Sequence, residues 1–90
     1  MSTVHIPATM RNEAAGRSTI TACGATVAEA VEIAASDYPG LRSRLFNDSG
    51  RLQAYVAIFV NSCDIRSLDG LDTALREDDE IHIIGAIAGG

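Results

Sequence analysis

One short helix constrains the fold of this 90-residue chain more than any other feature of its sequence. Thr26 and Glu29 have the spacing of a capping box, in which the threonine hydroxyl accepts the N3 amide and the glutamate reaches back to the cap amide. Pro39 and Gly40 are expected to end the helix, because proline disfavours a helical residue before it and glycine supplies left-handed geometry. A further short helical turn is predicted over residues 41–46. Apolar residues recur along the main helix at three- and four-residue steps and form one stripe of Val27, Ala30, Val31 and Ala34.

Two strands are predicted before this helix. Residues 3–7 alternate in character, with Val4 and Ile6 on one face. The β-branched residues 18–22 follow as a second strand that forms a hairpin with the first. Residues 11–17 are polar and predict a connecting loop.

Three more strands are predicted after the helix. Residues 55–60 are the most apolar run of the chain, and apolar residues on both faces indicate a central strand or one whose outer face meets a partner. Residues 65–66 are expected to form a brief fourth strand. Residues 80–84 form the last strand, with Ile81 and Ile83 on one face.

This order of elements predicts an α+β fold in which one main helix packs across a mixed four- or five-stranded sheet. Tryptophan is absent and aromatic residues are few, so the core must be aliphatic. We expect residues 1–84 to form the domain and residues 85–90 to form a flexible tail. Glycine has no Cβ, so the final Gly89 and Gly90 could pass through a narrow channel, and six extended residues reach about 20 Å.

Composition excludes several classes of function. A net charge of −5 argues against nucleic acid as a partner, because phosphate binding needs clustered cations. All seven basic residues are arginine, so no side chain of this protein can accept an isopeptide bond. The sequence has neither a signal-peptide pattern nor an apolar run of the roughly 20 residues that span a bilayer, which predicts a cytoplasmic protein without a membrane partner. Cys23 and Cys63 are too few and too far apart for a zinc or iron–sulfur site. They could form a disulfide with each other, but without a secretion signal we expect reduced, partly buried thiols.

The outer face of the predicted sheet is the candidate binding surface. If Val56, Ile58 and Val60 face the helix, the outward residues of this strand are Tyr55, Ala57 and Phe59, beside His82 and Ile84. An exposed apolar cluster of this kind marks a partner site. A second small core beneath loops is the alternative. His5 and His82 should lie on the same face, but two lone histidines supply no partner group, so we predict surface histidines and no metal site.

The element order and the ending resemble the MoaD/ThiS family of ubiquitin-like sulfur carriers, over essentially the whole chain. The resemblance is strongest in residues 55–61 with 64–66, in residues 73–75 with 79–81, and in the final Ala88-Gly89-Gly90. Residues 61–66 and 86–90 look most like the CysO-type carrier of cysteine biosynthesis. The resemblance implies a β-grasp fold whose last strand pairs in parallel with the first. Asp78 stands where the family usually has glycine, and we expect it to keep the left-handed turn.

The resemblance also implies a function in which the chain is a protein co-substrate and not an enzyme. A ubiquitin-activating-like adenylyltransferase would use ATP to adenylate the carboxylate of Gly90, which then becomes a thiocarboxylate, while Gly89 provides passage. The residues that contact the partner proteins would be Phe59, Ile84, Ile87 and Ala88. The sulfur would pass to a cysteine synthase, and a zinc peptidase would free the new cysteine. No cofactor is expected on the chain itself.

Other destinations for the tail remain open at the level of sequence. The chain could be the small subunit of molybdopterin synthase, with a large catalytic subunit as sulfur acceptor, or it could serve another sulfur-containing metabolite. It could be a ubiquitin-like modifier that conjugates to lysines of other proteins. A binding module that docks through the outer sheet face without tail chemistry is the third possibility.

Overall fold

Residues 2–85 are the part of the chain that the computed structural model describes. The strands are β1 (Ser2–His5), β2 (Thr19–Ala22), β3 (Val56–Val60), β4 (Cys63–Asp64) and β5 (Glu80–Gly85). The helices are α1 (Val27–Ser36), α2 (Pro39–Leu45) and the 3-10 helices η1 (Ala8–Ala14), η2 (Ile65–Ser67) and η3 (Gly70–Asp72).

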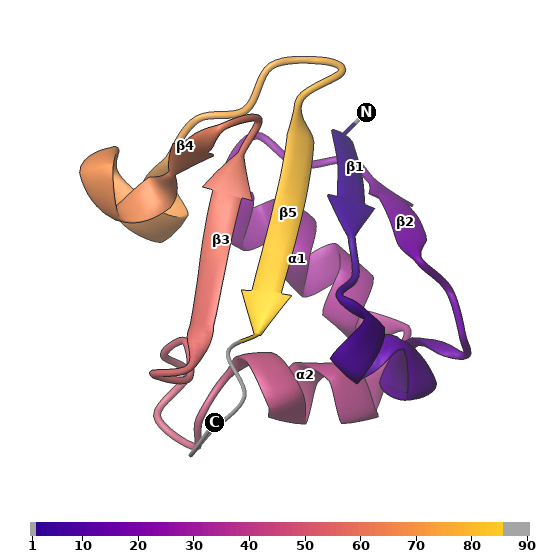
Figure 1. Ribbon diagram of the computed structural model, residues 1–90. Coiled ribbons are helices and arrows are strands. Elements are labelled where there is room, and N and C mark those ends of the chain that lie inside the picture. The colour runs from indigo at the N-terminus through magenta and orange to yellow at the C-terminus, as the bar shows by residue number, and fades with distance from the viewer. Residues whose placement is uncertain (1, 86–90) are drawn as a thin grey trace.

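The five strands form one mixed sheet in the order β2-β1-β5-β3-β4, and α1 crosses behind it in Figure 1. The first strand runs antiparallel to β2 and parallel to β5, while β3 runs antiparallel to both β5 and β4. The predicted α+β arrangement and the parallel pairing of first and last strands are therefore confirmed. The last strand lies at the centre of the sheet, hydrogen-bonded on both sides.

The core is aliphatic and lies between the inner face of the sheet and the helices. Alternation along β5 places Ile81 and Ile83 on this inner face, where both are buried. Each fully buried aliphatic side chain contributes about 1.5–3 kcal/mol of transfer free energy, so these contacts hold the central strand beneath α1. The predicted stripe of α1 is buried along its whole length, at Val27, Ala30, Val31 and Ala34.

The N-terminus of α1 has the predicted cap with one difference. The Thr26 hydroxyl accepts a hydrogen bond from the Glu29 N–H at 3.3 Å. The Glu29 carboxylate reaches one residue farther than expected and accepts from the N–H of Ala25 at 3.0 Å. Two backbone donors that precede or open the helix are thereby satisfied.

The main helix ends at Ser36, ahead of Pro39, and the helical turn predicted over residues 41–46 is present as α2. This second helix begins earlier than expected, with Pro39 at its start and Gly40 inside it, because the fixed φ of proline suits the first helical position. Two other predictions about connecting segments are wrong. Residues 11–17 were expected to form a loop, but residues 11–14 belong to η1, and the left-handed Ala15 caps the end of this helix. Residues 65–66 belong to η2 and not to a strand, because the Asp64 carboxylate accepts the Arg66 N–H at 2.9 Å and turns the chain.

The two cysteines also differ from prediction. Both Cys23 and Cys63 are free, but they are exposed and not partly buried. Cys23 follows β2 and Cys63 begins β4, which are the two edge strands of the sheet. No helix within residues 2–85 is both long and apolar enough to span a membrane.

Candidate functional site

The tail that the sequence singles out begins at the end of the central strand. Gly85, which the predicted division assigns to the tail, is the last residue of β5 and is the register partner of Val56 on β3. The predicted site residues Ile87, Ala88, Gly89 and Gly90 lie outside the described residues. The division into a domain and a flexible tail therefore stays a prediction.

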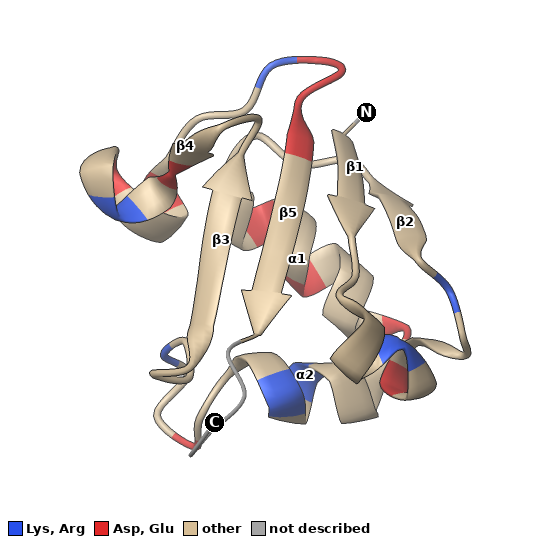
Figure 2. Ribbon diagram, viewed as in Figure 1, with Lys and Arg blue, Asp and Glu red and all other residues tan. Residues whose placement is uncertain are grey.

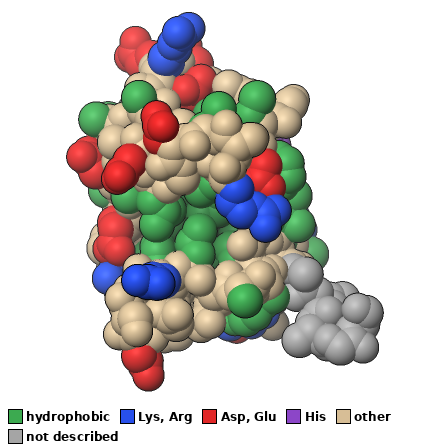
Figure 3. Space-filling model, turned by 90° about the vertical axis from the view of Figure 1, so that its left-hand side faces the viewer, with side chains coloured by type: hydrophobic (Ala, Val, Ile, Leu, Met, Phe, Trp, Pro, Cys, Tyr) green, Lys and Arg blue, Asp and Glu red, His purple; other side chains and the backbone are tan. Residues whose placement is uncertain are grey.

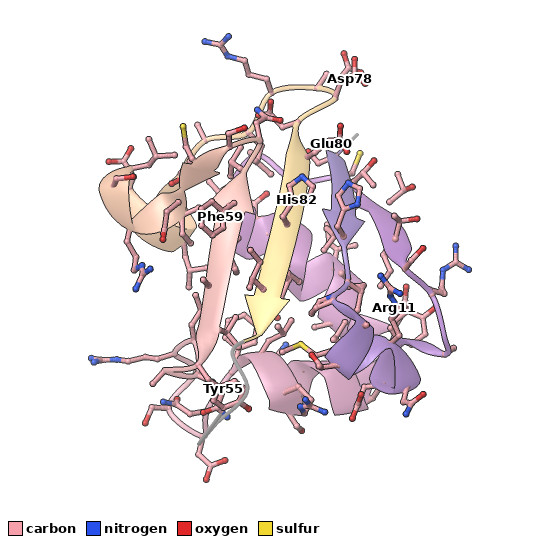
Figure 4. The ribbon with its side chains drawn as sticks, viewed as in Figure 1. Arg11, Tyr55, Phe59, Asp78, Glu80 and His82 are labelled. Carbon is pink, nitrogen blue, oxygen red and sulfur yellow. The ribbon has the colours of Figure 1, made fainter. Side chains whose placement is uncertain are left out.

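The outer face of the sheet brings together the other two predicted site residues. The antiparallel register of β3 and β5 sets Phe59 opposite His82. Ile84 follows two residues later on the same face of β5, and 49% of it is exposed. Figure 4 labels Phe59 and His82 on the side of the sheet that faces away from α1. Within the described residues no second core covers Ile84, which favours the docking-face interpretation.

Tyr55 does not join this face. It precedes β3, so the alternation of the strand does not extend to it. Its ring packs against the core, and its hydroxyl donates to the carbonyl oxygen of Arg44 at 3.2 Å. The prediction that Tyr55 points outward beside Phe59 is wrong.

The face forms a shallow cleft with mostly uncharged walls. The cleft is lined by residues of β1, β3, β5 and η1, among them His5, Pro7, Arg11, Phe59, His82 and Ile84. Arg11 is held at its margin by a hydrogen bond from Nε to the carbonyl oxygen of Ile6, at 3.1 Å. Among the five strands only Glu80 and Asp64 carry acidic groups. The acidic residues 77–79 lie in the loop at the N-terminal end of β5 (Figure 2).

A second apolar surface flanks the edge of β3. Figure 3 shows apolar side chains gathered in a hollow on this side of the molecule. An apolar cavity there is lined chiefly by Leu52, Val56, Ala57, Ile65 and Leu71. The hollow exists because β4 pairs only with Phe59 and Val60, which leaves the earlier residues of β3 without a strand on that side.

The two histidines lie side by side, with a carboxylate. Parallel register sets His5 on β1 directly opposite His82 on β5. Their rings are stacked, with centroids 4.3 Å apart and planes 9° apart. The His5 Nε2 atom lies 2.6 Å from a Glu80 carboxylate oxygen. The prediction of two lone histidines without a partner group is therefore wrong.

The sequence carried half of the signal for this cluster. Glu80 and His82 are two residues apart on one strand, which places them on one face. The missing half was the register between β1 and β5, since a shift of two residues would leave His5 on the same face but away from His82.

The start of β5 is fixed by Asn61, which has a left-handed φ of 56°. Its N–H donates to the Glu80 carbonyl at 2.7 Å, and its side-chain oxygen accepts the Glu80 N–H at 3.1 Å. The Arg76 N–H and the Asn61 amide both donate to the Asp79 carboxylate, and these bonds hold the pKa of Asp79 below its usual value. Asp78 has the expected left-handed backbone, with a φ of 68°.

Comparison with known proteins relates almost the whole chain to one family of proteins. The model of the ThiS family matches residues 4–90. The sulfur carrier protein CysO of Mycobacterium tuberculosis is 36% identical over 90 residues, which cover 98% of this chain and 97% of that protein.

Two solved structures extend the likeness to three dimensions. The crystal structure of the Amycolatopsis orientalis BexX/CysO complex contains a chain that matches with a TM-score of 0.89 and 32% identity, over 100% of both chains. Small archaeal modifier protein 1 of Methanosarcina acetivorans matches with a TM-score of 0.88 and 30% identity, over 99% of this chain and 95% of that one.

Proposed function

The chain belongs to the ThiS family, and from this premise we propose that it is a sulfur-carrier protein of the CysO type that serves cysteine biosynthesis. The observation that carries the proposal is a β-grasp sheet whose central strand β5 ends at Gly85, with three residues between it and a C-terminal diglycine. Full-length similarity to CysO supports this choice of pathway within the family.

The reacting group is the carboxylate of Gly90. A carboxylate is a poor electrophile, so an activating enzyme first joins it to the α-phosphate of ATP, and pyrophosphate leaves. A sulfur nucleophile then attacks the carbonyl carbon of this mixed anhydride, and AMP leaves. If the nucleophile is sulfide, a thiocarboxylate forms on Gly90 directly. If it is a persulfide, a thiol attacks the sulfur of the donor in the resulting acyl disulfide, forms a disulfide with that donor, and leaves the thiocarboxylate on Gly90. The chain needs no cofactor of its own, and the activating enzyme excludes water until sulfur arrives.

The folded domain presents the tail and contributes binding energy. Phe59 and Ile84 provide an apolar face for the activating enzyme, and Ile87 and Ala88 extend that contact along the tail. Gly89 allows the chain to enter a narrow pocket, because it has no side chain. This division of labour makes the protein a co-substrate whose chemistry is performed by its partners.

The partners follow from the reaction. An adenylyltransferase of the ubiquitin-activating type loads the tail, a cysteine synthase accepts the sulfur, and a zinc peptidase releases the new cysteine. The structure of a CysO in complex with BexX supports the view that such chains work through protein–protein complexes.

Intact mass spectrometry tests the carrier role. The protein is incubated with its activating enzyme, ATP and a sulfur source, and the mass of the whole chain is recorded. We expect one oxygen to be replaced by sulfur at Gly90. Omission of ATP, or deletion of Gly90, should abolish the change. An unaltered mass in the presence of an activating enzyme that loads a known carrier would overturn the proposal.

The thiocarboxylate form then identifies the acceptor. It is mixed separately with a cysteine synthase and with the large subunit of molybdopterin synthase, and sulfur loss is followed by mass. Faster loss to the cysteine synthase supports the CysO assignment. Faster sulfur loss to the large subunit of molybdopterin synthase would instead assign the chain to molybdopterin synthesis.

A second candidate function is protein modification. Similarity to small archaeal modifier protein 1 favours it. The absence of lysine excludes chains linked through this protein's own lysines, but it leaves lysines of other proteins as targets. Digestion of cellular proteins should reveal the tail in isopeptide linkage if this function operates, and its absence in cells that make the thiocarboxylate would restrict the protein to sulfur transfer.

A further inference from the structure

We propose that His5, Glu80 and His82 form a binding site for a divalent transition-metal ion of the zinc type. The site lies on the outer face of the sheet, where β1 and β5 run side by side. One donor atom from each of the three residues lies within 4.8 Å of the other two. The proposal concerns the isolated chain and does not depend on the carrier role.

The distances suit one shared ion after small side-chain rotations. Ligand atoms about 2.0–2.1 Å from a tetrahedral zinc ion are about 3.3 Å from one another. The His5 Nε2 and the Glu80 oxygen, at 2.6 Å, now share a hydrogen bond and would move slightly apart around an ion. The stacked rings, 4.3 Å between centroids, would tilt so that their nitrogens approach the same point.

The backbone already holds the three residues in register. Strand pairing sets His5 opposite His82, and Glu80 is the register partner of Thr3. Asn61 binds both the N–H and the carbonyl of Glu80, which fixes the first residue of β5. Metal ligands that project from paired strands need little reorganisation on binding, and this favours affinity.

The donor set selects the class of metal. Two imidazole nitrogens and one carboxylate suit zinc and its neighbours in the first transition row, whereas calcium and magnesium prefer oxygen ligands. Three protein ligands leave at least one coordination position open. The side chains of His5 and Glu80 are 33% and 54% exposed, so that position faces solvent.

An ion bound at this site would change the chemical character of the cleft on the outer face. His5 and His82 line the same cleft as Phe59 and Ile84. A bound ion would therefore place a positive charge, and a vacant ligand position, beside the apolar residues of this face. A donor group from another protein that covers this face could complete the coordination.

Metal titration of purified protein tests the site. The protein is prepared without an affinity tag. The substitutions Cys23→Ser and Cys63→Ser remove the two exposed thiols that would otherwise compete for the ion. Zinc binding is measured by calorimetry, and cobalt is used as a coloured substitute for zinc. We expect saturable binding of one ion per chain. His5→Gln and His82→Gln should each weaken binding by roughly tenfold or more, and Glu80→Gln should weaken it less.

Two controls make the result decisive. Glu32→Gln removes a carboxylate of α1 that pairs with Arg42, on the helix side of the sheet, and it should leave metal affinity unchanged. The nitrogen resonances of both imidazole rings in the Cys→Ser protein with its histidines intact should shift on zinc addition, a readout that does not depend on how any histidine variant folds. No saturable binding, or binding that is lost on removal of the cysteines, would overturn the site. So would ring resonances that do not respond to zinc, or an affinity that His82→Gln leaves unaltered.

Discussion

Asp78 occupies a backbone position that few side chains tolerate. Its φ of 68° lies in the left-handed region, where a residue with a Cβ is strained by about 1–2 kcal/mol, with aspartate among the less affected. The turn it forms delivers the chain into Glu80 and so into the central strand. A residue remote from the tail thus contributes to the geometry of the outer face.

Replacement of Asp78 by glycine should stabilise the protein slightly. Glycine relieves the left-handed strain but loses more conformational entropy on folding, so we expect the free energy of unfolding to rise by about 0.5 kcal/mol. Denaturant unfolding followed by circular dichroism measures it. Asp69→Gly is the matched control, because Asp69 has a φ of −97° and no left-handed strain to relieve. That variant should lose about 0.5–1 kcal/mol. Equal losses in the two variants would show that Asp78 carries no strain.

The elements differ in how much of their stability is local, and α1 is the most local of them. Its cap, its buried stripe and its length are all encoded within one segment. The Thr26 hydroxyl satisfies a backbone donor that has no partner inside the helix.

Loss of the cap should therefore weaken the whole fold. Thr26→Ala removes the acceptor for the Glu29 N–H, and we expect the free energy of unfolding to fall by about 1 kcal/mol. Thr26→Ser keeps the hydroxyl and should restore most of that loss. Thermal and urea unfolding of the three proteins provide the comparison. If serine and alanine behave alike, the hydroxyl is not the stabilising group.

Elements that are stabilised by residues close together in the chain could be predicted from sequence, and elements that depend on distant residues could not. Thr26, Glu29 and the apolar stripe gave α1 correctly, because helical periodicity and capping act over a few residues. The start of α2 at Pro39 was not predicted, because proline is compatible with both the end of one helix and the start of the next. Segments such as η1 and η2 depend on short turns that leave little compositional signal.

Pairing between distant strands was beyond the residues alone. The parallel contact of β1 with β5 came from the family resemblance, and its register came only with the structure. Without that register His5 and His82 were two unrelated surface residues. With it they are stacked against each other beside Glu80. The diglycine at the tail, by contrast, needed no register to be recognised.

At the scale of the whole molecule, the two faces of the fold have different tasks. The inner face of the sheet, with α1 and α2, provides the core. The outer face exposes Ile84 and Phe59 in a cleft beside the end of β5. Acidic residues lie mostly in loops and helices around it, which keeps the centre of the face suited to an apolar contact (Figure 2).

This arrangement predicts an asymmetric response to two isoleucine substitutions. Ile84→Ser on the outer face should raise the KM for the activating enzyme about tenfold, equivalent to a loss of about 1.4 kcal/mol of binding. Ile33→Ser is the matched control, because Ile33 is 41% exposed but belongs to α1, on the opposite side of the sheet. Adenylation kinetics measure both, with unfolding curves to verify that each variant is folded. Equal KM values for the two variants would show that the activating enzyme does not dock on the face that contains Ile84.

The parallel pairing of β1 with β5 also has a mechanical consequence. The two strands run in the same direction, so the start of β1 and the end of β5 lie at opposite ends of the sheet (Figure 1). A force that draws Gly85 away from residue 2 therefore loads the row of backbone hydrogen bonds between the strands lengthwise. Hydrogen bonds that are loaded in shear must break together, whereas hydrogen bonds that are pulled from one end of the row break one after another. A partner that pulls on the tail while residue 2 is held would accordingly load these hydrogen bonds in shear.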